Sequence, residues 1–507
     1  MESLTLDANG TGPAVEDRAL ALLRDVWLHG GRGRGHEMLL ATRVVLGSSR
    51  LGTPSVPGPL PADAVSAALA AGVEARARGG GGTTAPGQAL LSRSPGALRM
   101  LRQRLRLGSV LVGGTNGKTT TAAMIASMLR ASGLAVVHNR AGANLHWGVA
   151  TALLEQHGDI GVFEVDEAWL ALVAAELEPR AIVLGNLFRD RPDAYGELDA
   201  IAAAWAALAQ RCADGSTTFV LDADDPAVAS ISDRDVCLYG IEDGRVGLMV
   251  EEHAFDASLC RRCGAALEYS RRFLSHLGHW ACNSCGAVRP SPSVSAVRVD
   301  AAGLSGSRLT LGTPLGALDV RLPLPGLFNV YNALAAVAAA AVLDVPKRAI
   351  AEALTASVPA FGRGERIRVD GRAGELVILL MKNPAGANAL VRLLAGERAP
   401  LHLWIALNDA VADGRDVSWI WDASFEPLAG AVERVTCSGS RAAELALRLK
   451  YAGWPAGSIA VDADIETSLD AGLAASRGLL VALPTYSALI ELRSLLTSRG
   501  AAPPYWQ

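Results

Sequence analysis

The chain has 507 residues, of which 50% are hydrophobic and 19% are charged. This composition excludes a wholly disordered or collagen-like chain, and the length suits about three globular domains. The net charge of −4 argues against a protein whose main task is to coat nucleic acid, and only four of the 47 basic residues are lysines.

The start of the chain carries no recognisable targeting signal. Residues 1–7 are acidic and lack the basic and apolar regions of a secretory signal. The longest strictly apolar run, at 333–343, is far shorter than the roughly 18 residues that a membrane span needs. We therefore expect a cytoplasmic protein without a transmembrane segment.

Residues 1–62 are predicted to be a flexible N-terminal extension. An Arg-Gly run at 30–35 and a Pro-rich stretch at 54–59 are typical of a solvated linker, although the arginines also suit nucleic acid or anionic lipid. Residues 63–108 form a predicted N-terminal helical segment, with a helix expected at 95–107 that carries four arginines. These arginines fit either the solvated face of a docking helix or contact with a membrane surface or phosphates.

From Ser109 onward, short β-branched runs alternate with Ala-rich helical ones, which predicts an α/β fold with buried parallel strands and crossover helices. We assign 109–358 to a central domain, interrupted by a Cys-rich insert at about 255–292, and 359–507 to a smaller C-terminal α/β domain. The expected strands are 109–113, 134–137, 161–165, 181–184, 218–221, 376–380, 401–406 and 479–482, and a long helix is expected at 332–343.

A Gly-rich loop follows the first of these strands and precedes a helix expected at 122–129. Its residues are Gly114, Thr115, Asn116, Gly117, Lys118, Thr119 and Thr120. Glycines let backbone N–H groups face phosphates, Lys118 reaches the terminal phosphates, and the Thr119 hydroxyl suits Mg²⁺. The loop is a variant of the general Walker pattern, because Val112 stands where a further glycine is usual. The motif predicts ATP binding.

Glu164 lies near the end of the expected strand at 161–165. Mg²⁺ prefers hard carboxylate oxygen, so we predict that Glu164 and Thr119 bind magnesium. Taken alone, Glu164 also fits the Walker-B acid of a helicase-like ATPase.

Four of the seven cysteines form two Cys-x2-Cys pairs separated by 18 residues. This spacing predicts a zinc ribbon in which Cys260, Cys263, Cys282 and Cys285 hold structural Zn²⁺. Four thiolates leave no open coordination position, which argues against a catalytic zinc. Gly264 and Gly286 follow the two pairs, where tight turns are needed.

The loop sequence Gly-Thr-Asn-Gly-Lys-Thr-Thr resembles the ATP loop of the Mur ligases, which join an amine to a carboxylate through an acyl phosphate. Further stretches agree with that family in their order along the chain: Glu164, Asn186 with Asp190, 222–226 and 326–336. A Mur-type ATP domain with a four-Cys ribbon resembles the MurT family in particular, the ligase-like subunits of lipid II isoglutaminyl synthase. The stretches 380–388 and 407–422 also look like signatures of that family, and the resemblance covers about 65–507.

The resemblance implies a Mur ligase-type central P-loop ATPase domain and an ATP-dependent carbon–nitrogen ligase. The enzyme would activate the α-carboxyl of D-glutamate in the stem peptide of lipid II, and ammonia would then give D-isoglutamine. It further implies a heterodimer with a GatD-type glutaminase, because this chain offers no Gly-x-Cys-x-Gly elbow. Lipid II would be met at the inner face of the membrane, and no nucleic acid is implied.

The same resemblance gives roles to individual residues. Lys118 and Glu164 would be catalytic, and Asp416, in Asp-Gly-Arg-Asp, would complete the partner's Cys-His pair. A turn acid paired with Arg415 is the structural alternative for Asp416. Asn329 and Asn332 would contact nucleotide, with helix capping as their alternative, and Arg363 would reach phosphate from a hinge.

No lysine lies between Lys118 and Lys347, so the central domain cannot carry the carbamylated lysine of many Mur ligases. Three other functions stay open from the residues alone. They are a stand-alone Mur-like amino-acid or polyglutamate ligase, a nucleic-acid-dependent NTPase with a ribbon as its binding module, and a scaffold that binds ATP without chemistry.

Overall fold

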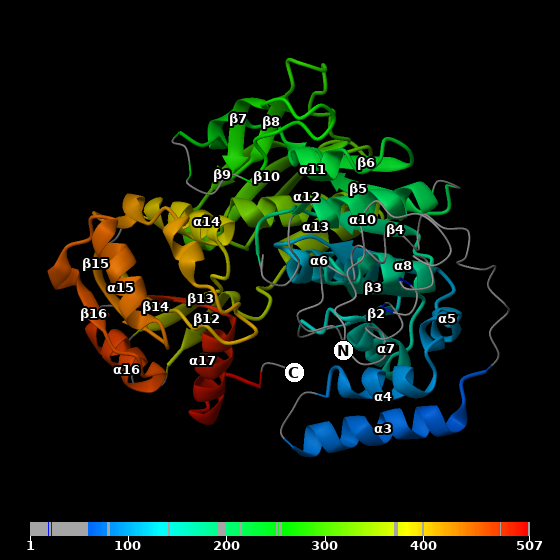
Figure 1. Ribbon diagram of the computed structural model, residues 1–507, viewed down its shortest axis with the longest axis horizontal. Coiled ribbons are helices and arrows are strands. Elements are labelled where there is room, and N and C mark those ends of the chain that lie inside the picture. Colours follow the sequence, from blue (N-terminus) through cyan, green and yellow to red (C-terminus); the bar gives the residue numbers. More distant parts are fainter. Residues whose placement is uncertain are drawn as a thin grey trace.

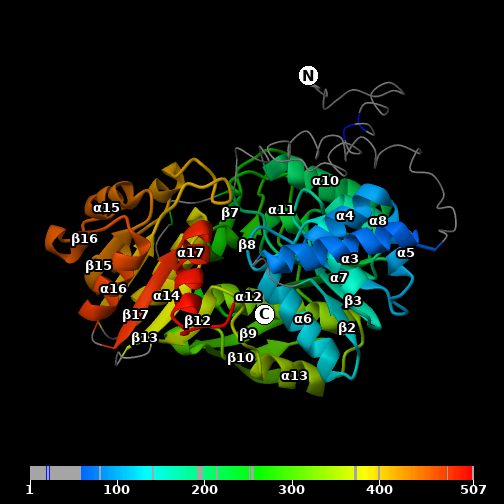
Figure 2. The ribbon, with the colours of Figure 1, turned by 90° about the horizontal axis from the view of Figure 1, so that it is seen from below.

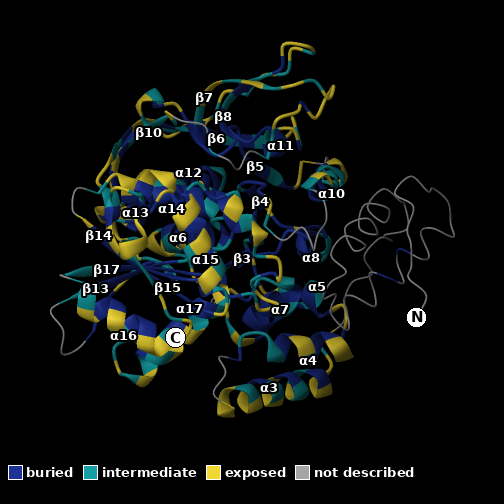
Figure 3. Ribbon diagram, turned by 60° about the vertical axis from the view of Figure 1, so that its left-hand side comes forward, coloured by how far each residue is buried: buried dark blue, intermediate teal, exposed yellow. Residues whose placement is uncertain are grey.

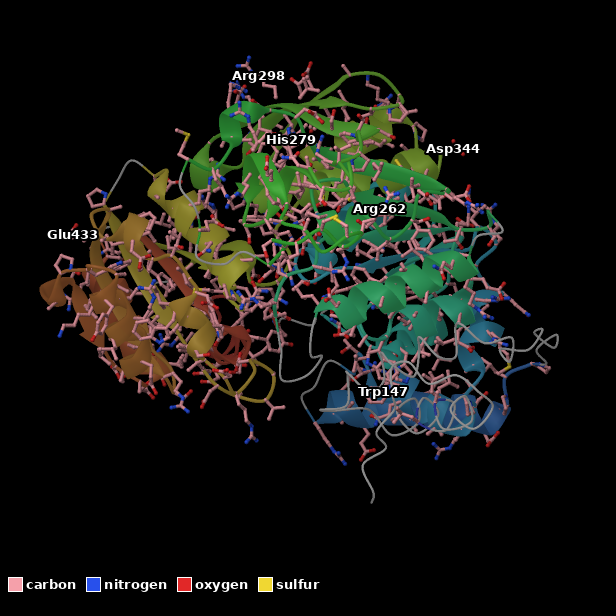
Figure 4. All side chains as sticks on the ribbon, turned by 45° about the horizontal axis from the view of Figure 1, so that its top comes forward. Trp147, Arg262, His279, Arg298, Asp344 and Glu433 are labelled. Atoms are coloured by element: carbon pink, nitrogen blue, oxygen red, sulfur yellow. The ribbon has the colours of Figure 1, made fainter. Side chains whose placement is uncertain are left out.

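The computed structural model describes residues 19, 22, 59–78, 82–139, 142–190, 198–212, 215–249, 252, 256–369, 374–397, 400–476 and 478–504. Two α/β domains of unequal size lie side by side (Figure 1). Figure 4 labels Glu433 on the smaller, C-terminal domain and Trp147 on the far side of the larger one. The predicted fold class, α/β with a second, smaller α/β domain, is confirmed.

The central domain is built on a nine-stranded sheet in the order β11-β10-β9-β6-β5-β4-β1-β3-β2. Strands β1 to β6 pair in parallel, as do β6 and β9, whereas β10 is antiparallel to both of its neighbours. The strands are β1 (Ser109–Gly113), β2 (Val136–His138), β3 (Ile160–Glu164), β4 (Ala181–Leu184), β5 (Thr218–Asp222), β6 (Val236–Ile241), β9 (Val294–Ala301), β10 (Ser307–Gly312) and β11 (Leu318–Leu322).

Helices cover both faces of this sheet. They are α6 (Lys118–Ala131), α7 (His146–Glu155), α8 (Leu170–Leu177), α10 (Leu198–Arg211), α11 (Pro226–Ala229), α12 (Leu327–Val342) and α13 (Lys347–Thr355). Leu111 and Phe163 pack in the core under α7, α8 and α10, whereas Val110 and Val162 pack in the core under α6, α12 and α13. The strands are therefore buried on both sides (Figure 3), which accounts for the continuous apolar runs in the sequence.

Three helices precede the central sheet: α3 (Ala62–Ala77), α4 (Ala85–Arg93) and α5 (Ala97–Arg102). Helix α4 packs between α3 and α7 (Figure 1), and α3 lies in front of both in the view from below (Figure 2). The helix expected at 95–107 is shorter than predicted, because it ends at Arg102. Arg99 pairs with Glu176 at 3.1 Å, and Arg106 pairs with Asp159 at 2.8 Å. These ion pairs favour the docking-helix interpretation of this segment.

Most of the predicted flexible extension, residues 1–62, lies outside the described residues. Residues 19, 22 and 59–62 of it are described, and Ala19 and Leu22 are buried in the same core cluster as Ala64 and Ala68. At these two positions the expectation of a free linker is therefore wrong. Within the described parts of the chain, no helix combines the length and the apolar character needed to cross a bilayer.

The Cys-rich insert contains the antiparallel hairpin β7 (Glu268–Leu274) and β8 (Leu277–Ala281). It packs on the acidic turn at 222–225, which follows β5. Trp280 Nε1 donates to the Ala223 carbonyl oxygen at 3.1 Å, and Arg289 Nε donates to Asp224 Oδ1 at 2.6 Å. The Tyr331 hydroxyl of α12 donates to the other oxygen of Asp224 at 2.7 Å. The fully buried Asp224 thus joins the insert, the sheet and α12.

The C-terminal domain has a six-stranded sheet in the order β12-β13-β17-β14-β15-β16, parallel except for the β12-β13 pair. Helices α14 and α15 cover one face and α16 and α17 cover the other. The elements are β12 (Arg363–Arg368), β13 (Glu375–Leu379), α14 (Pro384–Ala395), β14 (Leu401–Ala406), β15 (Val432–Ser438), α15 (Ala442–Tyr451), β16 (Ile459–Val461), α16 (Ile465–Ala475), β17 (Leu479–Pro484) and α17 (Tyr486–Ser498).

We expect Asp224→Ala to destabilise the protein by about 3–5 kcal/mol, because it removes one of the two carboxylates paired with Arg289 and leaves the buried Tyr331 hydroxyl and Ile241 N–H without their acceptor. Urea denaturation, followed by circular dichroism, measures the change in the free energy of unfolding. The matched control is Glu352→Ala, which removes an exposed ion pair with Arg348 and is expected to cost no more than about 0.5 kcal/mol. Equal stability of the two variants would contradict the anchoring role of Asp224.

Candidate active site

The phosphate loop connects β1 to α6 and is held in a shape that requires glycine. Gly114 has a φ of 130° and Gly117 a φ of 88°, backbone conformations that residues other than glycine rarely adopt. A Cβ on Gly117 would also lie 2.0 Å from Asn332 Oδ1. Helix α6 begins at Lys118, not at residue 122 as expected, so Lys118 and Thr119 lie in its first turn. The free N–H groups of this turn are suited to bind phosphate.

Lys118 is buried at the floor of the loop. Its Nζ donates to the Gly114 carbonyl oxygen at 2.6 Å and to Glu167 Oε1 at 2.8 Å. Burial alone lowers the pKa of Lys118, but the carboxylates of Glu167, Asp166 and Glu164 outweigh it and raise that pKa above its usual value. The side chain is therefore a fixed positive charge. No sequence pattern assigned a role to Glu167, although it lies only three residues after Glu164.

Thr119 and Glu164, the predicted magnesium ligands, lie next to each other. The Thr119 hydroxyl donates to Glu164 Oε2 at 2.8 Å. Asn139 fixes the backbone of Glu164, since its Nδ2 donates to the Glu164 carbonyl at 2.8 Å and its Oδ1 accepts from the Glu164 N–H at 2.9 Å. A hydroxyl beside a carboxylate at the phosphate loop fits Mg²⁺, so these two residues would hold it. Asn139 carried no signal in the sequence.

The loop after β4 braces the phosphate loop. The Asn116 N–H donates to Asn186 Oδ1 at 2.9 Å, and the Thr115 N–H donates to the Asn186 carbonyl at 2.8 Å. The Phe188 N–H donates to the Thr115 hydroxyl at 3.0 Å. The phosphate loop is therefore preformed. The same brace continues to Arg189, which forms ion pairs with Asp256 at 2.5 Å and Asp422 at 3.7 Å.

Asn329 and Asn332 lie on the first turns of α12, against the phosphate loop. Asn332 Nδ2 donates to Asn329 Oδ1 at 3.0 Å, and the Thr121 hydroxyl donates to Asn332 Oδ1 at 3.4 Å. The N-cap of α12 is Gly326, so capping does not account for either asparagine. Both line the cavity described next, which suits the predicted contact with nucleotide.

A cavity lies between the phosphate loop and the C-terminal domain. One side is polar, with Asn116, Gly117, Thr120, Asn186, Asn329, Asn332, Arg363 and Lys382, and the other is mainly apolar, with Leu274, Phe328, Leu379, Leu380 and Leu390 among its residues. Arg363 is half-buried; its backbone N–H donates to the Ala360 carbonyl at 2.9 Å, whereas its guanidinium makes no hydrogen bond or ion pair with the described residues. Burial lowers the pKa of Arg363, an effect that the charge of Glu164 opposes. A cation with no partner facing this cavity suits a phosphate.

The C-terminal domain reaches the phosphate loop through two consecutive residues. Lys382 Nζ donates to Asp190 Oδ2 at 3.0 Å and to the Thr115 carbonyl at 3.2 Å. Asn383 Nδ2 donates to Asn116 Oδ1 at 3.1 Å. Sequence analysis placed both residues in the 380–388 stretch but assigned neither of them a role. Their contacts join positions some 190 to 270 residues apart, which no local pattern reveals.

The four predicted zinc ligands come together away from this cavity. All four Sγ atoms lie within 4.8 Å of one another, with Cys260 and Cys285 at 3.6 Å and Cys263 and Cys282 at 3.5 Å. A tetrahedral site with Zn–S bonds of about 2.3 Å places its sulfurs about 3.8 Å apart, so the cluster fits Zn²⁺. The glycines after each pair have φ values of 75° and 73°, as the predicted tight turns need. Figure 4 labels Arg262, within the first pair, and His279 of β8.

Asp416 is separate from both sites. It is exposed on the turn that follows β14, and its Oδ1 accepts from the Ser418 N–H at 2.8 Å. Hydrogen bonds from Ser418 lower the pKa of Asp416, so the carboxylate is ionised at neutral pH. The Asp416 carboxylate is therefore oriented by a hydrogen bond from Ser418, and not by the ion pair with Arg415 that was the structural alternative.

Family models and individual relatives both place this chain in the same family. Residues 380–489 match the MurT ligase C-terminal family, and residues 112–288 match the Mur ligase middle domain. The chain is 31% identical over 435 residues to the MurT subunit of the glutamine-hydrolysing lipid II isoglutaminyl synthase of Streptococcus pneumoniae, covering 83% of this chain and 93% of that protein. The Staphylococcus aureus subunit of the same name is 33% identical, with 82% and 93% covered.

The fold is also shared with a solved structure. The pseudomurein peptide ligase type C from Methanothermus fervidus has a TM-score of 0.63 at 24% identity, covering 79% of this chain and 80% of that one. At this identity the likeness shows the Mur ligase fold alone.

We expect the purified protein to contain about one zinc per chain, and Cys282→Ser to lose it, because a buried thiolate cannot be replaced by a hydroxyl in such a site. Elemental analysis by plasma mass spectrometry measures the metal. Cys212→Ser is the control, since Cys212 packs against the core of the central domain and is not part of the cluster. Full zinc content in Cys282→Ser would contradict the four-thiolate site.

Proposed function

The chain belongs to the MurT family of lipid II isoglutaminyl synthase subunits, and from this premise we propose that it amidates the α-carboxyl of D-glutamate in the lipid II stem peptide. It is an ATP-dependent ligase with the Mur ligase fold. The names of the two relatives point to lipid II as the substrate and to glutamine as the source of nitrogen. A GatD-type glutaminase would supply the ammonia, and the heterodimer would act at the cytoplasmic face of the membrane, where the lipid-linked substrate is presented.

The reaction has two balanced steps. A carboxylate oxygen of D-glutamate attacks the γ-phosphorus of ATP, the bond to the β–γ bridging oxygen breaks, and ADP leaves from the resulting acyl phosphate. Ammonia then attacks the acyl carbon, the carbon–oxygen bond to phosphate breaks, and the nitrogen loses a proton. A carboxylate is a poor electrophile by itself, and phosphorylation supplies the leaving group.

The residues of this chain serve the first step through position and charge. The α6 N–H groups bind the phosphates, and the buried Lys118 offers a fixed positive charge to the transferred group. Mg²⁺ held by Thr119 and Glu164 would neutralise charge that develops between the β- and γ-phosphates. Arg363 adds a second cation from the C-terminal domain.

One observation carries the proposal of a separate glutaminase: the ATP site is complete, but the described cysteines do not suit glutamine hydrolysis. Burial raises the pKa of Cys437 to about 12 and of Cys237 to about 11, which leaves both as inert thiols. Cys212 follows the C-terminal end of α10 and packs against the core of the central domain. The remaining cysteines form the zinc cluster. This supports the proposal that another chain releases the nitrogen.

Asp416 is our candidate for the contact that serves this partner. It is ionised and exposed, and its carboxylate is oriented by a backbone hydrogen bond from Ser418. An aspartate in that state is suited to hold a neighbouring histidine in the correct tautomer. The turn lies within the matched MurT C-terminal region.

We expect the chain, co-expressed with a GatD-type glutaminase, to form a stable complex that amidates lipid II with glutamine and ATP. The chain alone should accept only ammonium. Mass spectrometry of the product measures the change from carboxyl to amide. ATP turnover with free amino acids but not with lipid II would instead support the stand-alone ligase, and turnover that depends on nucleic acid would support the NTPase.

We expect Asp416→Asn to reduce glutamine-dependent amidation by roughly 10²- to 10⁴-fold, because an amide does not stabilise the protonated histidine of the partner. Ammonium-dependent amidation should change little, since Asp416 does not line the ATP cavity. Both rates are measured on the same complex, whose formation is checked by size-exclusion chromatography. Equal loss with both nitrogen sources, or no loss, would overturn the assignment.

A further inference from the structure

Lys382 is one of only four lysines in the chain, and it lies directly opposite the phosphate loop. It follows β13 and precedes α14, so the C-terminal domain carries it. Its Nζ is 3.2 Å from the Thr115 carbonyl oxygen and 3.0 Å from Asp190 Oδ2. The side chain is 28% exposed and lines the cavity between the domains. An ammonium group thus faces the space that the phosphates of ATP would enter.

Two lysine–carboxylate pairs lie at the phosphate loop, and Lys382 is the member of these pairs that lines the cavity. Lys118 is paired with Glu167 at 2.8 Å, and Lys382 is paired with Asp190 at 3.0 Å. Burial lowers the pKa of Lys382; Asp190 opposes this effect, and the nearby charge of Lys118 adds to it. Two cations in one low-dielectric site repel each other, and here the carboxylates of Glu167 and Asp190 offset that repulsion. A terminal phosphate carries the negative charge that could take the place of Asp190 beside Lys382.

The position of Lys382 is fixed by the residue that follows it. Asn383 is the N-cap of α14, and its Oδ1 accepts from the Gly386 N–H at 2.8 Å. Its Nδ2 donates to Asp190 Oδ1 at 2.9 Å and to Asn116 Oδ1 at 3.1 Å. Pro384 at the first position of α14 restricts the backbone further. Lys382 is therefore aimed at the phosphate loop by a helix start rather than by a mobile loop.

We propose that Lys382 binds the terminal phosphate of ATP across the domain interface, and that Asp190 is its counter-ion when nucleotide is absent. The inference rests on the proposed use of ATP at this site. On nucleotide binding, the ammonium exchanges a carboxylate partner for a phosphate partner without leaving the cavity. Among the described residues, Lys382 and Asn383 are the residues through which the C-terminal domain forms hydrogen bonds with the phosphate loop. The exchange therefore couples nucleotide binding at that loop to the position of the C-terminal domain.

A purely structural ion pair between the domains is the competing explanation. In that case substitutions of Lys382 and of Asp190 would have equal effects on activity, because each substitution removes the same contact. A phosphate-binding lysine predicts an asymmetry instead: the cation is essential for nucleotide, and its counter-ion matters much less. The two explanations are separated by comparing the two residues in one assay.

The test measures binding of Mg-ATP by calorimetry and ammonium-dependent amidation of lipid II, both on the full chain in complex with its glutaminase. We expect Lys382→Met to lower kcat/KM for ATP by roughly 10²- to 10³-fold, the usual loss when one donor to a developing phosphate charge is removed. Lys382→Arg should recover part of this loss, and Asp190→Asn should lose less than about tenfold. Lys347→Met is the control, since Lys347 is an exposed lysine at the start of α13 and should behave as the unmodified chain.

Unchanged ATP affinity and kcat/KM in Lys382→Met would overturn the proposal. Equal losses in Lys382→Met and Asp190→Asn, with ATP affinity intact in both, would also overturn it in favour of a structural pair. Zinc content and thermal unfolding confirm that each variant is folded. Failure of the proposed function gives a different result: the unmodified complex would bind ATP but would not amidate lipid II. Even then, comparing ATP binding among the variants decides the role of Lys382.

Discussion

The buried ammonium of Lys118 is the group around which the active site is arranged. Parallel pairing of β3, β1 and β4 brings their carboxyl ends to one edge of the sheet, and the phosphate loop, Glu164 and Asn186 follow those three ends. Removing a positive charge from water is tolerated only where carboxylates surround it, and Glu167 meets that condition. The loop glycines and α12 then close around the same point.

The loop after β4 and the turn after β5 connect this site to the rest of the molecule. Asn186 braces the phosphate loop, while Arg189, three residues later, forms ion pairs with Asp256 near the ribbon and Asp422 of the C-terminal domain. Asp224 ties the ribbon to α12, which also carries Asn329 and Asn332. The zinc ribbon is therefore joined to the nucleotide site through ordinary buried contacts, although its metal ligands are remote from the cavity.

Sequence reasoning succeeded where a signal is local. The strands at 109–113, 181–184 and 401–406 have the predicted bounds, because a doubly buried strand is a short apolar run with turns at both ends. The predicted start of α6, at residue 122, is one helical turn late, because Lys118, Thr119 and Thr120 were counted as part of the phosphate loop. The helix at 95–107 was overextended, because arginines that point to Glu176 and Asp159 have the same spacing as a solvated face.

The sequence by itself determined the phosphate loop, the ribbon spacing and the α/β class, since each depends on residues within a few positions of one another. Only the tertiary structure decided that Glu167 pairs with Lys118, that Asn139 holds Glu164, and that Lys382 faces the phosphate loop. These contacts join residues from 25 to 267 positions apart. They arise because separate strands and domains dock against one another. The packing of buried surfaces determines that docking, and no short sequence pattern reveals it.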